Sequence, residues 1–125
     1  LFGGICTDAY YIEGIRQMRE RFPGCRFFLF TNDRAWAAGD GARMFSAPDT
    51  TWIDLSGGDN DYTEFVLMSR CKHHILANSS FSWWASYLNK NPGKTVLAPQ
   101  RWLNGVDNSD FYRADMQKVT LLQEP

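Results

Sequence analysis

A serine-rich turn is the segment of this sequence with the clearest chemical potential. Asn78, Ser79 and Ser80 separate an apolar, strand-like run from an aromatic run of helical spacing. In an open α/β sheet, a strand points its carboxyl end at the ligand crevice. The next helix begins there with unpaired N–H groups and a partial positive charge. The two serine hydroxyls and the backbone N–H groups of Phe81 and Ser82 would therefore suit a phosphate. Ser is also a preferred N-cap, so the local pattern leaves plain capping as the alternative.

Polar residues at two other places could contact the same ligand. Asn32 and Asp33 follow an apolar run, where the carboxyl end of a second strand would lie. Turn chemistry explains this pair equally well, because Asn and Asp serve strand-to-helix corners without any ligand. Glu64 could close a capping box with Asp61, three residues earlier, and contact with a ligand is the alternative that stays open.

The sequence predicts no metal site and no histidine base. The Asn32-Asp33 pair lacks a DxD arrangement, and no His, Cys or Asp cluster has metal-binding spacing. His73 and His74 are adjacent, so in a strand their side chains point to opposite faces. We expect one to be an interior histidine and the other a surface group, and we assign no catalytic residue.

Size and charge restrict the function classes. The chain has 125 residues and a mass of 14.4 kDa, which fits one domain over residues 1–125. Its 44% hydrophobic content is that of an ordinary globular protein. The formal net charge of −1 argues against broad binding to nucleic acid or to an anionic membrane. Any phosphate binding must therefore be local.

Cysteine usage and hydropathy bear on the compartment. Cys6, Cys25 and Cys71 are widely spaced and odd in number, so neither a disulfide framework nor a CxxC motif is present. No apolar run approaches the length of a membrane span, and no signal-like segment is visible. We expect a cytoplasmic location, with peripheral membrane association left open. The sequence begins without Met, so a segment upstream can be missing from it.

Apolar periodicity predicts alternating helices and strands, which implies βαβ units in a mostly parallel, doubly wound α/β sheet. In the helix expected at 81–88, Trp83 with Tyr87 and Trp84 with Leu88 form two i,i+4 stripes, so that helix is predicted to be buried on more than one side. The predicted elements are a helix at 8–22, a strand at 26–30 covered on both faces, a helical turn at 35–38 followed by loop, a strand at 52–55, helices at 61–71 and 81–88 around a strand at 74–77, a strand at 95–98, a loop at 100–110, a short helix at 111–116 and a last strand at 119–122.

Four segments together resemble the α-1,2-fucosyltransferase family. They are ICTDAYYIEGI near the start, FFLFTND from Phe27, EFVLMSRCKHHILANSSFSWWASYLN from Glu64 and VLAPQRW from Val96. The long central string is highly specific, whereas the others are weak singly. The resemblance implies the Rossmann-like, C-terminal half of a GT-B glycosyltransferase, with GDP-fucose as donor, a galactoside as acceptor and no metal or other cofactor.

The resemblance also assigns roles to residues. In this family the Ser-Phe-Ser helix start meets the donor diphosphate, which implies that role for Ser79, Ser80 and Phe81. An acidic residue at the position of Glu64 is expected to recognise guanine, although the family more often carries Asp there. The family's Arg-containing HxRxGD-type segment has no counterpart in this sequence. We therefore expect the isolated chain to be inactive.

Two alternatives come from other classes of protein. A non-catalytic nucleotide-binding or regulatory α/β domain would keep a phosphate-binding helix start without acceptor machinery. A flavodoxin-like or receiver-like domain would need a cluster of acids at neighbouring strand ends, and the sequence does not supply one.

Overall fold

The structure is a computed structural model that describes residues 4–31, 34–53 and 61–121. The predicted site residues Asn32 and Asp33 lie outside the described residues. The elements are α1 (Asp8–Arg21), β1 (Phe27–Leu29), α2 (Arg34–Trp36), a π-helical turn (Ala37–Gly41), α3 (Ala42–Met44), β2 (Thr50–Trp52), α4 (Asp61–Ser69), β3 (His74–Ile75), α5 (Ser80–Leu88), β4 (Val96–Ala98), a 3₁₀ turn (Ser109–Phe111) and β5 (Met116–Lys118).

Every strand pairing among the described residues is parallel. β1 pairs with β2, with Phe27 opposite Thr50. β4 lies between β3 and β5, with Val96 opposite both His74 and Met116. The described strands form two parallel sheets, one of two strands and one of three, so the prediction of an α/β fold with parallel strand pairing is confirmed, whereas a single doubly wound sheet stays a prediction.

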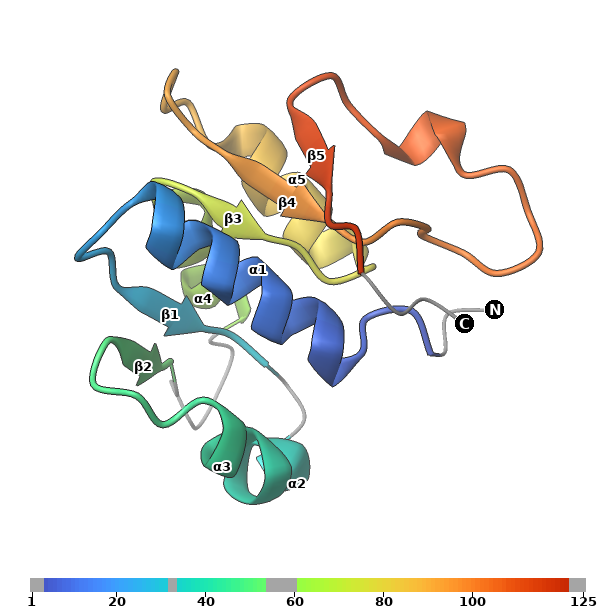
Figure 1. Ribbon diagram of the computed structural model, residues 1–125. Helices are drawn as coiled ribbons and strands as arrows, with labels where there is room; N and C mark the ends of the chain where they lie inside the picture. The colour runs from blue at the N-terminus through green and yellow to red at the C-terminus, as the bar shows by residue number, and fades with distance from the viewer. Residues whose placement is uncertain (1–3, 32–33, 54–60, 122–125) are drawn as a thin grey trace.

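Helices cover both faces of the strands, with α1 in front and α4 and α5 behind (Figure 1). This arrangement follows from the two-residue period of a strand, which points neighbouring side chains to opposite faces. In β4, Leu97 packs into the cluster with Tyr10 and Met18 of α1, whereas Val96 joins the cluster that contacts Trp83 of α5.

The longest helix, α1, begins and ends where local sequence signals place it. Thr7 is the N-cap, and its Oγ1 accepts a hydrogen bond from the Tyr10 backbone N–H at 3.3 Å. Phe22 caps the other end through its N–H, and Gly24 then turns the chain at φ +82°. At the centre of the helix, Gly14 is buried, and a Cβ there would lie 3.1 Å from Cγ2 of Ile75. A residue without a side chain therefore lets α1 approach β3 closely.

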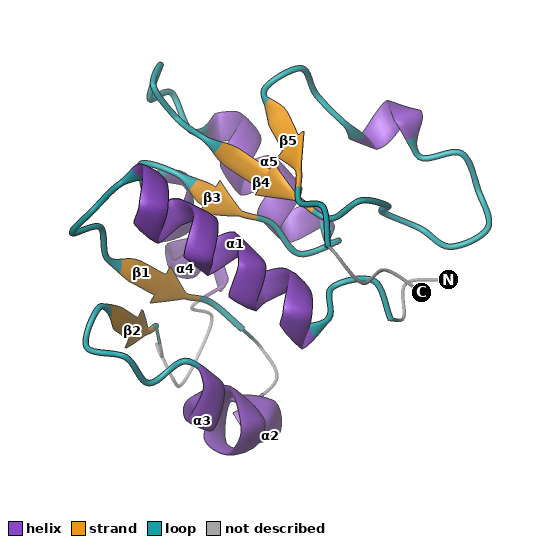
Figure 2. Ribbon diagram, viewed as in Figure 1, coloured by secondary structure: helices purple, strands orange, loops and turns teal. Residues whose placement is uncertain are grey.

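Three predicted elements are corrected by the structure. Residues 34–44 form one continuous helical run with a π turn, not a single helical turn followed by loop (Figure 2). The expected helix at 111–116 is a 3₁₀ turn that ends at Phe111. The last strand is Met116–Lys118, earlier than predicted. Parallel pairing with β4 decides that register, because Val96, Leu97 and Ala98 take Met116, Gln117 and Lys118 as partners.

Two burial predictions are also wrong. The strand β1 was expected to be covered on both faces, yet its Phe28 side chain is about half exposed, at 48%. The helix α5 was expected to be buried on more than one side, yet Trp84, Tyr87 and Leu88 are all about half exposed. Within the described ranges, no helix is long and apolar enough to cross a membrane.

Candidate functional site

The start of α5 is a tightly hydrogen-bonded turn. Ser79 is the N-cap with extended backbone angles, and its Oγ accepts from the Ser82 N–H at 3.2 Å. The Ser82 hydroxyl is buried and donates to the Ala77 carbonyl oxygen at 2.7 Å. The two hydroxyl oxygens lie 3.0 Å apart. The hydroxyls of Ser79 and Ser82 are therefore used within the turn itself, whereas that of Ser80 is not.

The exposed groups at this helix start are those of Ser80 and Phe81. Ser80 is exposed, and Phe81 is 37% exposed. The Ser82 N–H is occupied by Ser79, and the next N–H, that of Trp83, donates to the Ser79 carbonyl. Within the described part of the chain, no hydrogen bond uses the N–H of Ser80 or Phe81. These two N–H groups, with the partial positive charge of the helix start, are what this turn offers to an anion.

Asn78 links the end of β3 to the loop that follows β4. Its Nδ2 donates to the Trp102 carbonyl oxygen at 3.2 Å, and its backbone also hydrogen-bonds to the Cys6 thiol. Burial raises the pKa of that thiol. The amide side chain of Asn78 thus holds two loops together at the carboxyl edge of the sheet.

Glu64 lies on α4, next to the contact between α4 and α5. It is half-buried, and its neighbour Phe65 packs edge-on against Phe81 with the ring centroids 5.5 Å apart. Its carboxylate makes no hydrogen bond or ion pair with any residue the structure describes. The Asp61 side chain, its partner in the alternative capping box, lies outside the described residues.

Tyr10 is a residue at this edge that the sequence pattern did not single out. Its hydroxyl donates to the Leu76 carbonyl oxygen at 2.6 Å, and the Leu97 carbonyl oxygen lies 3.4 Å from the same hydroxyl. Tyr10 therefore connects α1 to the chain at β3 and β4. Burial raises its pKa well above the ordinary tyrosine value. The hydrogen bond of this hydroxyl joins residues 66 positions apart, so no local pattern in the sequence indicates it.

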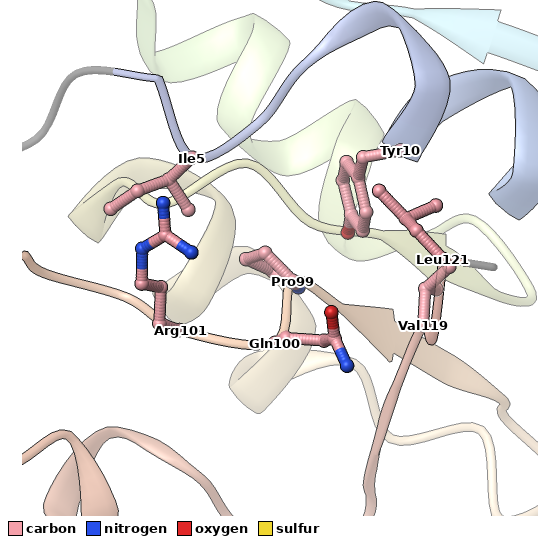
Figure 3. Close-up of a pocket in the computed structure, with 7 residues that line it drawn as sticks. All are labelled: Ile5, Tyr10, Pro99, Gln100, Arg101, Val119 and Leu121. Atoms are coloured by element: carbon pink, nitrogen blue, oxygen red, sulfur yellow. The ribbon is translucent and has the colours of Figure 1, made fainter. Parts of the chain in front are cut away.

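Beside Tyr10 lies a small cavity of about 10 Å³ (Figure 3). Gln100 and Arg101, which follow β4, supply its polar groups. The Arg101 Nε donates to the Asn104 side-chain oxygen at 2.8 Å. Arg101 is exposed, so it places a cation at the same edge of the sheet as the start of α5. Position after a strand is the signal that could have found it.

The loop that leaves β4 is held by a second buried hydroxyl. The Tyr112 hydroxyl donates to the Pro99 carbonyl oxygen at 2.5 Å, and burial raises the pKa of Tyr112 to about 12. Trp102 is buried and stacks parallel to Phe111, with ring centroids 6.1 Å apart. This packing fixes the backbone on either side of Arg101.

Of the two histidines, His74 is the interior one that the sequence predicts, whereas His73 precedes β3 and is half-buried, not a surface group. His74 is buried, and Asn89 Nδ2 lies 2.7 Å from its Nε2. Burial, assisted by the cations of Lys94 and Arg113, lowers the pKa of His74 to about 4. His73 is half-buried and stacks on Phe22, and its Nδ1 accepts from the Thr95 N–H. Both histidines are at the start of β3, the opposite end of the strand from the start of α5.

A metal-binding cluster of side chains is absent from the described part of the chain. Among residues 4–31, 34–53 and 61–121, no group of three His, Cys, Asp or Glu side chains could hold a metal ion.

Comparison with known proteins decides the family. Residues 2–118 match the family described as Glycosyl transferase family 11. The chain belongs to this family. The resemblance anticipated from the sequence motifs is thereby confirmed.

Two curated relatives come from Escherichia coli. The chain is 36% identical over 108 residues to an alpha-1,2-colitosyltransferase, covering 86% of this chain and 37% of the relative. It is 31% identical over 108 residues to the O-antigen biosynthesis glycosyltransferase WbnK, covering 86% of this chain and 35% of that protein. The chain thus spans about a third of the length of these relatives. No solved structure matches it significantly.

Proposed function

We propose that this chain is the donor-binding part of a family 11 glycosyltransferase that transfers L-fucose from GDP-fucose to the 2-hydroxyl of a galactoside. The observation that carries the proposal is the start of α5, where the N–H groups of Ser80 and Phe81 lie at the carboxyl edge of a parallel sheet. This is where open α/β sheets bind nucleotides, and a helix start favours phosphate. The architecture proposed for the parent is the two-domain GT-B arrangement.

The proposed chemistry is an inverting transfer. The acceptor hydroxyl attacks the anomeric carbon of the donor, the bond from that carbon to the diphosphate oxygen breaks, and GDP leaves. Negative charge then accumulates on the departing diphosphate. Fixed N–H donors at the α5 start stabilise that charge without having to reorient. Arg101 supplies a positive charge at the same edge.

Donor selection is assigned to Glu64. Its carboxylate would accept the N1–H and 2-amino hydrogen bonds that distinguish guanine from adenine. Two observations support this role: Glu64 is half-buried beside the α4–α5 contact, and its carboxylate is free of described partners. The identity of one relative as an alpha-1,2-colitosyltransferase favours a colitosyl donor as the second candidate sugar.

The first test is calorimetric titration with GDP, GDP-fucose, ADP and UDP, using a variant that removes one backbone donor. Ser80 is the first helical residue of α5, a position that accepts proline, and the extended angles of Ser79 (φ −137°, ψ 151°) suit the residue before a proline. Ser80→Pro therefore deletes one N–H with little effect on folding. We expect it to weaken GDP binding by roughly tenfold, the value of one charge-assisted hydrogen bond.

The matched control is Ser80→Ala, which keeps the N–H and removes only the hydroxyl. We expect it to bind GDP almost as tightly as the unaltered chain. Glu64→Gln is expected to bind GDP and ADP with similar affinity, because guanine selectivity is lost. Equal affinity of the unaltered protein at its full natural length for GDP, ADP and UDP would refute the proposed donor.

A further inference from the structure

The helix α5 carries its large apolar side chains on its outer face. A surface helix normally buries its apolar stripe and exposes polar residues. In α5 the arrangement is reversed: Trp84, Tyr87 and Leu88 are 50%, 52% and 48% exposed. The side chains that α5 buries are Ser82, Ala85 and Ser86. A large exposed apolar surface of this kind marks an interaction site.

This surface continues onto α4. A groove between the two helices is lined by Tyr62 of α4 and Leu88 of α5, and by Arg70 and Lys90, which follow the ends of these helices. The rings of Trp84 and Tyr87 contact each other edge-to-face at 5.5 Å. We call the surface formed by Tyr62, Arg70, Trp84, Tyr87, Leu88 and Lys90 the α4–α5 face. It lies on the side of the strands opposite α1 (Figure 1).

The charge around this face is of one sign. Residues 65–106 contain five basic residues and no acidic one, whereas the rest of the chain contains eight basic and fourteen acidic residues. The net charge of −1 therefore conceals a basic segment. Arg70, Lys72 and Lys90 are exposed, and none of them forms an ion pair with another described residue.

Among the described residues, the acidic groups near the face are few. Asp115 pairs with Lys94 at 3.5 Å and with Arg113 at 3.0 Å, and the Arg113 guanidinium lies 4.6 Å from the ring centre of Trp83. Glu64 lies at the other end of α4 from Arg70. Within the part of the chain that the structure describes, the charge left unpaired on the α4–α5 face is therefore positive.

We propose that the α4–α5 face docks on the surface of an anionic lipid bilayer. Trp and Tyr prefer the interface between headgroups and acyl chains, and exposed Lys and Arg attract anionic headgroups. Trp84, Tyr87 and Leu88 enter the interface, while Arg70, Lys72 and Lys90 meet the phosphates. A second copy of the chain is the weaker occupant, because it would bring the same basic side chains against one another.

The test is vesicle binding by the protein at its full natural length, with phosphatidylcholine vesicles that contain or lack phosphatidylglycerol. We expect binding to the anionic vesicles alone, weakened by added salt and accompanied by a blue shift of tryptophan fluorescence. The variant Arg70→Glu/Lys90→Glu should bind roughly thirtyfold more weakly or worse, since each basic residue near an anionic surface contributes about fivefold. Trp84→Ser should reduce the binding that persists in salt and abolish most of the blue shift.

A matched control separates position from net charge. The variant Arg26→Glu/Arg43→Glu changes the net charge by the same amount. Arg26, just before β1, and Arg43, in α3, are both exposed and lie away from α4 and α5. We expect this control to bind like the unaltered protein. The proposal is overturned if the folded protein does not bind anionic vesicles, if the control variant loses as much affinity as the test variant, or if Trp84→Ser instead dissociates a dimer.

Discussion

His74 shows how a single buried side chain couples stability to pH. In the folded protein its pKa is about 4, mainly because burial disfavours the charged ring, whereas an unfolded histidine has a pKa near 6.5. The unfolded state therefore takes up a proton first as the pH falls. The contribution of the neutral ring to the free energy of unfolding is at its maximum above about pH 6.5. It decreases as the pH falls toward 4, and it is constant below that value.

We predict that lowering the pH from 7 to 5 costs the folded state about 2 kcal/mol through His74 alone. Urea unfolding at the two pH values, compared between the unaltered protein and His74→Gln, measures this difference. His73→Gln is the control, because His73 is only half-buried and its ring stacks on Phe22. An identical pH dependence in the unaltered protein and in His74→Gln would contradict the prediction.

The serines of the α5 turn differ in role: some stabilise the turn, and one is exposed and accessible to a ligand. The hydroxyls of Ser79 and Ser82 are already used within the turn, whereas Ser80 is exposed. Ser79→Ala is therefore expected to lower the free energy of unfolding by about 1 kcal/mol, as loss of an N-cap does, and Ser80→Ala to leave it almost unchanged. Chemical denaturation of both variants checks this pair. Equal stability of the two would contradict the capping role.

At the scale of elements, the approach of α1 to β3 depends on Gly14. A Cβ at this position already lies 3.1 Å from Cγ2 of Ile75, so a branched side chain overlaps it. We predict that Gly14→Val lowers the free energy of unfolding by about 1–3 kcal/mol, the usual cost of overpacking. Gly39→Val is the control, since a Cβ at Gly39 meets nothing within 4 Å. Thermal or urea unfolding compares the two, and equal stability would refute the close approach.

At the scale of the whole molecule, the strands differ in how well they are protected. Val96, Leu97 and Ala98 of β4 are at most 1% exposed and are paired on both sides. The pair β1–β2 includes the exposed Phe28. We predict that the β4 amides exchange with deuterium most slowly and that the β1 and β2 amides exchange earlier. Hydrogen exchange measured by NMR checks this order, and faster exchange in β4 than in β1 would contradict it.

The chain covers only part of the length of its relatives, and this bears on whether it is active by itself. It spans 37% of the alpha-1,2-colitosyltransferase and 35% of WbnK, so an acceptor site and further donor contacts can lie in the remainder. We predict that the isolated chain transfers no sugar from GDP-fucose to a galactoside. A transferase assay beside the protein at its full natural length checks this, and turnover by the isolated chain would refute the prediction.

The sequence by itself determined the parts of this protein that rest on local signals. Apolar periodicity located α1, apolar runs located β1, β3 and β4, and the serine turn was placed correctly at the start of α5. The ordered motifs also identified the family. These features depend on interactions between residues a few positions apart, and local sequence patterns indicate such interactions directly.

Only the tertiary structure decided which groups of those elements are free. The Ser82 hydroxyl donates to the Ala77 carbonyl oxygen, and the Tyr10 hydroxyl of α1 donates to the Leu76 carbonyl oxygen. The Trp83 indole N–H donates to the Phe111 carbonyl oxygen. The register of β5 and the outward position of the large side chains of α5 were likewise set by packing. Contacts of this kind join segments that are distant in the chain, and their energies depend on geometry that no local pattern records.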